Sequence, residues 1–225
     1  MSCIYVSPHE QRFIRPFRLG VKLEAEAVIP NGIRTDLLLK HLPKPVRHDK
    51  FTFLAYGGRN SQKRIDILVK AGELLSRESK DFEILITKGV DTLDVLNEIY
   101  HNGYPSWLKP IPQNTDITKI LSMADCFVST SRRETFSFAI CEASVYGLPV
   151  IQSDIEGTRW NANNPSTFLF RNLDYKDLAK KMAQLMKIPT NELFEKCMET
   201  RKSNALNYSM EAWVEKIINF YKANA

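Results

Sequence analysis

Hydrophobic residues in this chain gather in short continuous runs, and amphipathic stretches separate the runs. The runs have the apolar and aromatic character of buried strands and occupy residues 51–56, 82–86, 107–111, 126–128, 150–151 and 167–170. The stretches between them have the apolar spacing of helices, over residues 64–77, 91–101 and 116–123 and in the segment that stops at Gly147. This alternation predicts a parallel sheet with helices on both faces, that is, a doubly wound α/β domain with a Rossmann-like fold over residues 51–187.

Other patterns flank this alternation. A mixed basic stretch at residues 11–22 precedes an apolar run that ends in Pro30-Asn31-Gly32. That ending predicts a turn, because Asn and Gly tolerate a positive φ. Two prolines within residues 41–50 predict an extended linker. After residue 187 we expect two more helices, and the second carries an apolar stripe of Trp213, Ile217, Phe220 and Tyr221.

The stretch of residues 129–151 carries the strongest chemical signal. It leaves an apolar run, passes through a polar loop, enters a helix and stops at Gly147 and Pro149. Glu134 lies in the loop, and Glu142 lies on the helix about two turns later. A loop that leads from a parallel strand into a helix favours phosphorylated ligands, because free backbone N–H groups and the helix dipole attract anions there.

A second candidate segment follows the apolar run at residues 51–56. It reads Gly57-Gly58-Arg59, then three residues, then Lys63-Arg64. Glycines after a strand allow close backbone approach, and Arg and Lys supply positive charge for a diphosphate. The chain has no Gly-x-Gly-x-x-Gly and no Walker motif, so NAD-binding and ATPase functions lose their main support. The alternative is that these bases are solvated charges at a helix start, which is disfavoured because they would oppose the helix dipole.

Composition narrows the function further. The chain is 44% hydrophobic and 25% charged, as expected for a globular protein, and its net charge of +5 suits a polyanionic small ligand or peripheral contact with an anionic membrane. No nucleic-acid-binding module, secretory segment or membrane-spanning run is present. The four cysteines lack Cys-x-x-Cys spacing and the four histidines are scattered, which predicts reduced thiols, a cytoplasmic location and no metal site.

The extended pattern around Glu134 and Glu142 is similar to that of a known family. Glu-x7-Glu, with Phe136-Ser137 after the first Glu and Ala-x3-Gly-x-Pro-Val-Ile after the second, resembles the donor site of family-4 retaining glycosyltransferases with the GT-B fold. The string Val28-Ile29-Pro30-Asn31-Gly32 also resembles the junction at which that family's C-terminal domain begins. The alternative is that both glutamates are solvated charges at an ordinary helix start.

The resemblance implies how a diphosphate would be held. Arg59 and Lys63 match the two bases that hold the donor pyrophosphate, and Gly58 lies beside them. Arg64 replaces the usual small residue after the lysine, so it could share or take over that role. The chain contains no Asp-x-Asp pair. The resemblance therefore implies a metal-independent site, with no cofactor beyond the nucleotide-sugar donor.

The resemblance also implies how the sugar and nucleoside would be held. Glu142 would accept hydrogen bonds from the ribose hydroxyls, and Glu134 would contact hydroxyls of the donor sugar. Lys88 and Gly89 end a strand where the family places the nucleobase. The loop at residues 152–158 retains one glycine where paired glycines are common, so we assign it no sugar contact. The diphosphate would receive backbone N–H groups from Phe136, Ser137 and Phe138, whose two phenyl rings we expect in the core.

The resemblance covers residues 27–225, which correspond to the C-terminal half of a typical member. Residues 1–30 would be a remnant of, or substitute for, the N-terminal acceptor domain, and residues 31–50 would be the junction and linker. The nucleotide-sugar-binding domain would occupy residues 51–187, and C-terminal helices residues 188–225. We expect such a chain to need an N-terminal acceptor-domain subunit and to show no transfer alone. The stripe on the last helix would pack either on that other domain or on the chain's own core.

Three functions remain open. The leading hypothesis is the donor-binding half of a retaining glycosyltransferase of polysaccharide biosynthesis, which moves a sugar to a glycan or lipid-linked acceptor. The second is a non-catalytic nucleotide-sugar-binding accessory subunit on the same fold. The third, a basic protein that binds nucleic acid, has no module signature to support it.

Overall fold

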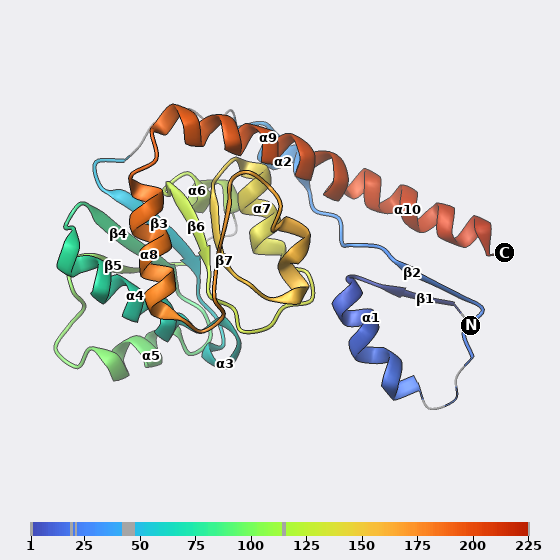
Figure 1. Cartoon of the computed structure of the whole chain (residues 1–225), viewed down its shortest axis with the longest axis horizontal. Helices are drawn as coiled ribbons and strands as arrows, with labels where there is room; N and C mark the ends of the chain where they lie inside the picture. Colours follow the sequence, from blue (N-terminus) through green and yellow to red (C-terminus); the bar gives the residue numbers. More distant parts are fainter. Residues whose placement is uncertain (1, 19, 21, 42–47, 114–115, 225) are drawn as a thin grey trace.

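The computed structural model describes residues 2–18, 20, 22–41, 48–113 and 116–224. Its centre is a sheet of six parallel strands in the order β5-β4-β3-β6-β7-β8, which is the order of a doubly wound Rossmann fold (Figure 1). The fold expected from the alternating pattern is therefore confirmed. The strands are β3 (Phe51–Tyr56), β4 (Phe82–Thr87), β5 (Leu108–Ile111), β6 (Cys126–Ser129), β7 (Val150–Ser153) and β8 (Thr167–Phe170).

The central strands are apolar throughout because both faces of the sheet are covered. In β3, Phe53 and Leu54 are fully buried although they point to opposite faces. Helices α4 (Ile65–Glu78) and α8 (Tyr175–Met186) pack on the face of Phe53. Helices α2 (Thr35–Leu39), α6 (Ile117–Leu121) and α7 (Phe138–Tyr146) pack on the face of Leu54.

Two short helices lie beside the strand ends. Helix α3 (Asn60–Lys63) follows β3, and α5 (Thr92–Ile99) follows β4. Asp91 precedes α5 in a left-handed conformation, and its side chain makes no capping hydrogen bond. A 3-10 helix, η2 (Glu156–Asn161), follows β7.

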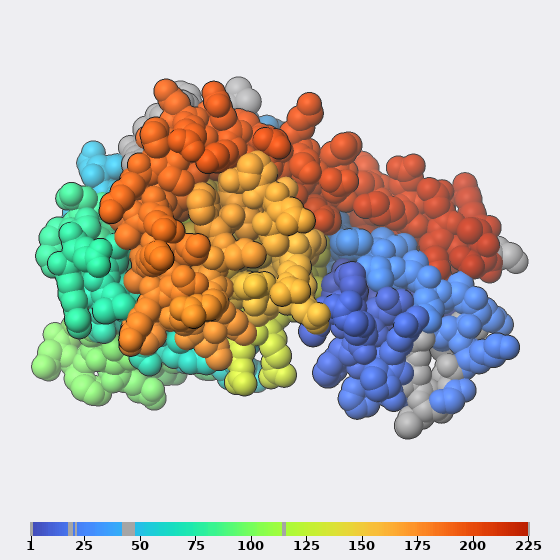
Figure 2. Space-filling model, in the orientation of Figure 1, coloured from blue at the N-terminus to red at the C-terminus, as the bar shows by residue number. Residues whose placement is uncertain are grey.

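The N-terminal residues form a small unit outside the main sheet. Strands β1 (Ser2–Tyr5) and β2 (Ala25–Val28) pair in parallel, and α1 (Pro8–Ile14) and η1 (Arg15–Arg18) connect them. The unit contacts the main domain through α1, where His9 and Arg12 each reach the carboxylate of Glu156 at 2.8 Å. In the space-filling view the unit and the C-terminal helix form a lobe beside the larger α/β domain (Figure 2).

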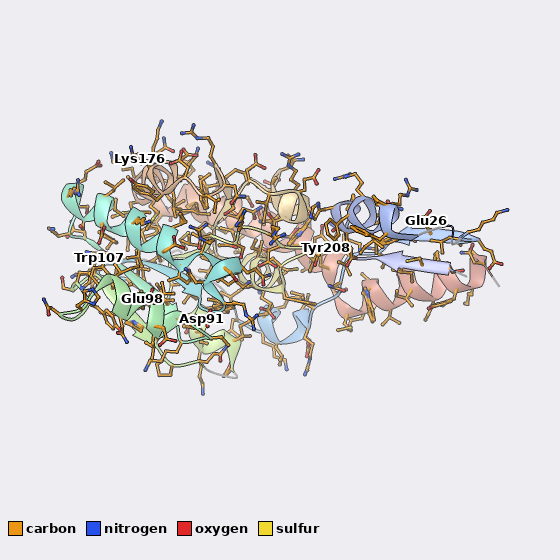
Figure 3. All side chains as sticks on the ribbon, turned by 90° about the horizontal axis from the view of Figure 1, so that it is seen from below. Glu26, Asp91, Glu98, Trp107, Lys176 and Tyr208 are labelled. Atoms are coloured by element: carbon orange, nitrogen blue, oxygen red, sulfur yellow. The ribbon has the colours of Figure 1, made fainter. Side chains whose placement is uncertain are left out.

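The C-terminal helices differ in their packing. Helix α9 (Thr190–Tyr208) crosses the main domain, and Tyr208 lies where that domain meets the N-terminal lobe (Figure 3). Helix α10 (Met210–Ala223) then runs out beside β2, and none of its residues is buried (Figure 1). The apolar stripe of α10 belongs to neither core cluster of the described residues, so it does not pack on the sheet of its own domain. Most of the expected linker, residues 42–47, lies outside the described part of the chain.

Candidate functional site

A pocket of about 620 Å³ opens at the carboxyl ends of β3 and β4. It lies beside the boundary between β3 and β6, where successive strands of the chain diverge to opposite sides of the sheet, which is the usual ligand position in such folds. The segment around α2 forms the opposite wall. The lining residues are Gly32, Ile33, Arg34, Leu37, Leu38, Tyr56, Gly57, Lys63, Thr87, Gln113, Ile117, Ile120, Phe138, Glu142 and Met210.

Glycines bring two strand-end loops into direct backbone contact below this pocket. A Cβ added to Gly57 would lie 2.0 Å from the carbonyl oxygen of Thr87, and one added to Gly89 would lie 2.7 Å from the backbone of Gly57. The hydroxyl of Thr87 also accepts a hydrogen bond from the Gly57 N–H at 3.0 Å. Gly57 and Gly89 are therefore required for the packing of the two loops. Gly58 instead faces the side chain of Lys63, to which an added Cβ would come within 3.2 Å.

Lys63 and Glu134 meet as an ion pair. The Lys63 Nζ lies 2.7 Å from Glu134 Oε1, and Ser131 Oγ donates to the same oxygen at 2.9 Å. The Thr130 hydroxyl donates to the Lys63 carbonyl at 2.7 Å, which ties α3 to the loop after β6. The structure thus brings the expected base and the expected carboxylate together from positions 71 residues apart.

The other two basic residues differ in their surroundings. Arg59 is exposed just before α3, and no described residue pairs with its guanidinium. Arg64 adopts a left-handed backbone with φ of 52°, and its guanidinium makes two hydrogen bonds with Asp66, at 2.9 and 2.8 Å. This pairing raises the pKa of Arg64. Because Asp66 engages two of the three nitrogens of its guanidinium, Arg64 is less available to an anion than Arg59.

The N-terminus of α7 lies beside this ion pair. Ser137 precedes the helix at a φ of 70°, is buried, and makes no side-chain capping bond. The first N–H groups of α7 have no partner within the helix, so they face outward with the positive end of its dipole. Ser137 and Lys63 both border a void of about 10 Å³ next to the pocket. The expected anion-binding elements are therefore neighbours.

The two phenylalanines that flank Ser137 have different environments. Phe136 is buried and stacks on Trp160 with ring centroids 4.9 Å apart, as expected for a core residue. Phe138 is 51% exposed and lines the pocket, so its expected core position is wrong. The helix begins at Phe138, which turns this ring away from the core that Phe136 enters.

Helix η2 supports the loop that carries Glu134. A Cβ added to Gly157 would lie 1.7 Å from the carbonyl oxygen of Glu134, so only glycine fits there. Trp160 Nε1 donates to the carbonyl of Phe136 at 2.7 Å. The sequence did reveal a lone glycine in this loop, but its role is backbone packing against the acidic loop.

Glu142 lies on the pocket wall and is partly buried. Burial raises the pKa of its carboxyl to about 7. None of the described residues makes a hydrogen bond to this carboxylate. Glu142 is therefore an acceptor that is held in an apolar wall and is open to the pocket, an arrangement that is common at ligand-binding sites.

Some lining residues were not predicted from the sequence, and of the predicted residues only Lys63, Phe138 and Glu142 line the pocket itself. Tyr56, Thr87 and the segment of Gly32 to Arg34 line the pocket. The turn at Pro30-Asn31-Gly32 was a sequence signal for that segment, but nothing in the pattern marked Tyr56 or Thr87. Lys88 is exposed and is not among the lining residues, although its N–H joins the sheet at Ile111. Among the described residues, no cluster of three or more His, Cys, Asp or Glu could hold a metal ion.

The family assignment follows from a match to residues 40–204, which carry the main sheet and most of the residues that line the pocket. This segment matches the model of the family described as glycosyl transferases group 1. The chain belongs to the glycosyl transferases group 1 family. A search of curated proteins finds no significant match. None of the described helices combines the length and hydrophobicity needed to span a membrane.

Solved structures share the fold of this group 1 chain. A glycosyltransferase from Rickettsia africae ESF-5 has a TM-score of 0.82 at 20% identity, over 98% of this chain and 62% of that one. Anabaena Alr3699/HepE in complex with UDP-glucose has a TM-score of 0.83 at 17% identity, over 98% of this chain and 63% of that one. S. aureus TarM, in a complex that contains UDP, has a TM-score of 0.81 at 20% identity, over 97% and 43%. The chain therefore spans 43–63% of the length of these structures, and the likeness shows the GT-B type of fold.

Proposed function

We propose that this chain is the donor-binding half of a retaining, metal-independent glycosyltransferase, and that it holds a nucleoside diphosphate sugar in the pocket beside α7. One observation carries the proposal: Lys63 and Glu142 line one pocket, and the N-terminus of α7 lies beside them. A cation and free helix N–H groups suit a diphosphate, and an unpaired carboxylate suits a pair of ribose hydroxyls. The family membership and the UDP-containing structures of similar fold support this choice of ligand.

The chemistry assigned to each group follows from its position. The leaving diphosphate gains negative charge as the sugar departs, and Lys63, Arg59 and the α7 dipole would stabilise that charge without a metal. Glu134 would contact the sugar hydroxyls, because its carboxylate lies next to the diphosphate-binding lysine. Lys63 would then exchange part of its contact with Glu134 for the diphosphate.

The acceptor and a partner subunit complete the proposal. The β1–β2 unit is a two-stranded parallel sheet, and such sheets are normally covered on both faces. Phe13 and Phe17 in this unit are 59% and 66% exposed. We infer that an acceptor-binding α/β subunit covers this lobe and that the acceptor is a glycan or a lipid-linked glycan at a peripheral cytoplasmic site. The GtfA/B complex, with a TM-score of 0.78 at 18% identity, is a structure of similar fold whose name gives two components.

Isothermal titration tests the donor assignment. UDP, GDP and ADP, with and without an attached glucose, would be titrated against the whole chain in buffer that contains EDTA. We expect one nucleotide to bind with a stoichiometry of one, with no change when Mg²⁺ replaces EDTA. A random DNA duplex is the control for non-specific attraction to the basic chain. Binding of the duplex without binding of any nucleotide would contradict the proposal, and a strict Mg²⁺ requirement would contradict metal independence.

A further inference from the structure

Tyr56 has a hydroxyl that the structure leaves without a partner. Its oxygen is buried, and among the described residues it is the one buried side-chain polar atom that makes no hydrogen bond. Burying such a group costs more free energy than a typical hydrogen bond returns, so native proteins rarely keep one without a reason. Other buried polar side chains of the described residues are hydrogen-bonded. Asn204 bonds to Asn161 and Ser144, and Asn161 bonds to Gln152.

The position of Tyr56 follows from the alternation of side chains along β3. Phe53 and Ala55 face the α4 side, while Leu54 and Tyr56 face the α7 side. The Tyr56 ring packs edge-on against Phe127 with ring centroids 5.0 Å apart, and this contact fixes the direction of the phenol. Tyr56 lines the same pocket as Glu142. Burial raises the pKa of the Tyr56 hydroxyl, and the negative charge of Glu142 raises it further. The two polar groups therefore lie near each other on one wall.

Their chemistry is complementary. The Tyr56 hydroxyl is a donor without an acceptor, and the Glu142 carboxylate is an acceptor without a described donor. A ligand hydroxyl can satisfy both groups together, because its oxygen accepts one hydrogen bond while its hydrogen donates another. Two adjacent hydroxyls on a ribose ring offer this arrangement in a rigid form.

We propose that Tyr56 is a specificity residue of the pocket, which donates a hydrogen bond to a ribose hydroxyl that in turn donates to Glu142. This inference rests on the proposed nucleotide-sugar function and adds a contact that the Glu-x7-Glu pattern does not contain. The site then recognises a ribonucleoside over its deoxy form through both groups. Removal of the ligand hydroxyl leaves the buried Tyr56 hydroxyl and the partly buried Glu142 carboxylate without that partner, so discrimination exceeds the loss of one bond.

The test combines one protein change with one ligand change. Tyr56→Phe removes the hydroxyl and keeps the ring, and UDP, 2′-deoxy-UDP and 3′-deoxy-UDP are titrated against both proteins. We expect UDP to bind Tyr56→Phe roughly three- to tenfold more weakly than the wild type. The deoxy nucleotide that lacks the contacted hydroxyl should bind both proteins equally. Tyr104→Phe is the matched control, because its hydroxyl bonds to Asn97 at 2.6 Å and does not line the pocket.

Stability separates this role from a structural one. Because the hydroxyl lacks a protein partner, Tyr56→Phe should leave the urea midpoint unchanged or raise it. The void of about 10 Å³ that Tyr56 also borders is large enough for about one water molecule. Unchanged UDP affinity together with a lowered urea midpoint would overturn the inference, because the hydroxyl would then be satisfied inside the protein. If the wild type binds UDP and Tyr56→Phe binds it equally, only this inference fails; if no UDP, GDP or ADP binds, the proposed function fails with it.

Discussion

Glu142 should make the stability of the free protein depend on pH. Burial raises the pKa of its carboxyl from 4.5 to about 7. Because the folded-state pKa lies above the unfolded value, the folded protein binds the Glu142 proton more tightly than the unfolded chain. The contribution of this proton to the free energy of unfolding is fully present below pH 4.5 and is lost as the pH rises toward 7. A pKa change of one corresponds to about 1.4 kcal/mol, so the complete loss is roughly 3 kcal/mol. Between pH 5 and pH 8 the change is about 2–3 kcal/mol.

The substitution Glu142→Gln isolates this effect. Glutamine has nearly the same shape but does not ionise, so its burial costs the same at every pH. We expect Glu142→Gln to be close to the wild type in unfolding free energy at pH 5 and about 2–3 kcal/mol more stable at pH 8. Urea denaturation of both proteins at the two pH values gives this difference directly. Glu98→Gln is the control for a general effect of exchanging a carboxylate for an amide, because Glu98 is exposed on α5 and does not line the pocket (Figure 3).

Ligand binding should act in the opposite direction. Ribose hydroxyls donate to the ionised carboxylate, so bound nucleotide favours the charged form that burial disfavours. Glu142→Gln should therefore stabilise the free protein and weaken nucleotide binding about ten- to a hundredfold at pH 8. A constant stability gap between the two proteins from pH 5 to pH 8 would refute the reasoning, because it would show that Glu142 is ionised at no cost in the folded state.

Four further outcomes test other parts of the site. Lys63→Met should weaken the binding of a nucleoside diphosphate about ten- to a hundredfold. Lys180→Met removes the same charge from an exposed position on α8 and should not weaken it. Equal effects of the two substitutions in titration would indicate non-specific attraction. Gly157→Ala should lower the unfolding free energy by about 2–3 kcal/mol, because its Cβ collides with the Glu134 carbonyl, and wild-type urea stability would contradict this packing. Trp160→Phe should cost about 1–2 kcal/mol through the lost bond to the Phe136 carbonyl, and an unchanged urea midpoint would argue against that bond. The chain alone should show no transfer from a labelled nucleotide sugar to glycan acceptors, since transfer needs both reactants held together, and robust activity would contradict the half-enzyme proposal.

The fold was predictable from sequence because its strands are buried on both faces. Strands such as β3 and β4 then read as continuous apolar runs, and helices with one apolar face separate them. The helix pattern was less informative about helix ends, where tertiary contacts determine the backbone conformation. The helix was expected to begin at residue 91, but Asp91 adopts a left-handed conformation with φ of 63° and α5 begins at Thr92. Gly57 after the strand did indicate a close backbone approach, but nothing in the sequence indicated that Gly89 and Thr87 are the backbone it meets.

The site was predictable in its charged residues and less so in its apolar and neutral ones. Lys63 and Glu134 stand out in sequence because each follows an apolar run and precedes a helical stretch, which is where parallel α/β sheets place phosphorylated ligands. Phe136 and Phe138 could not be separated by pattern, since one is buried by Trp160 from a distant segment and the other opens to the pocket. Tyr56 continues an apolar strand, so its unpaired hydroxyl becomes visible only when its neighbours are known.

Unfavourable features of the free protein concentrate around this pocket. Ser137 holds a positive φ that costs a non-glycine residue about 1–2 kcal/mol. Glu142 is partly buried without a described hydrogen-bond donor, and the buried hydroxyl of Tyr56 has no partner among the described residues. Poor packing does not explain this, because Phe136, Trp160 and Tyr208 pack closely just behind the Ser137 turn. Ser137, Glu142 and Tyr56 lie close to an ion pair and a helix N-terminus, and a ligand that supplied the missing hydrogen bonds would offset their cost.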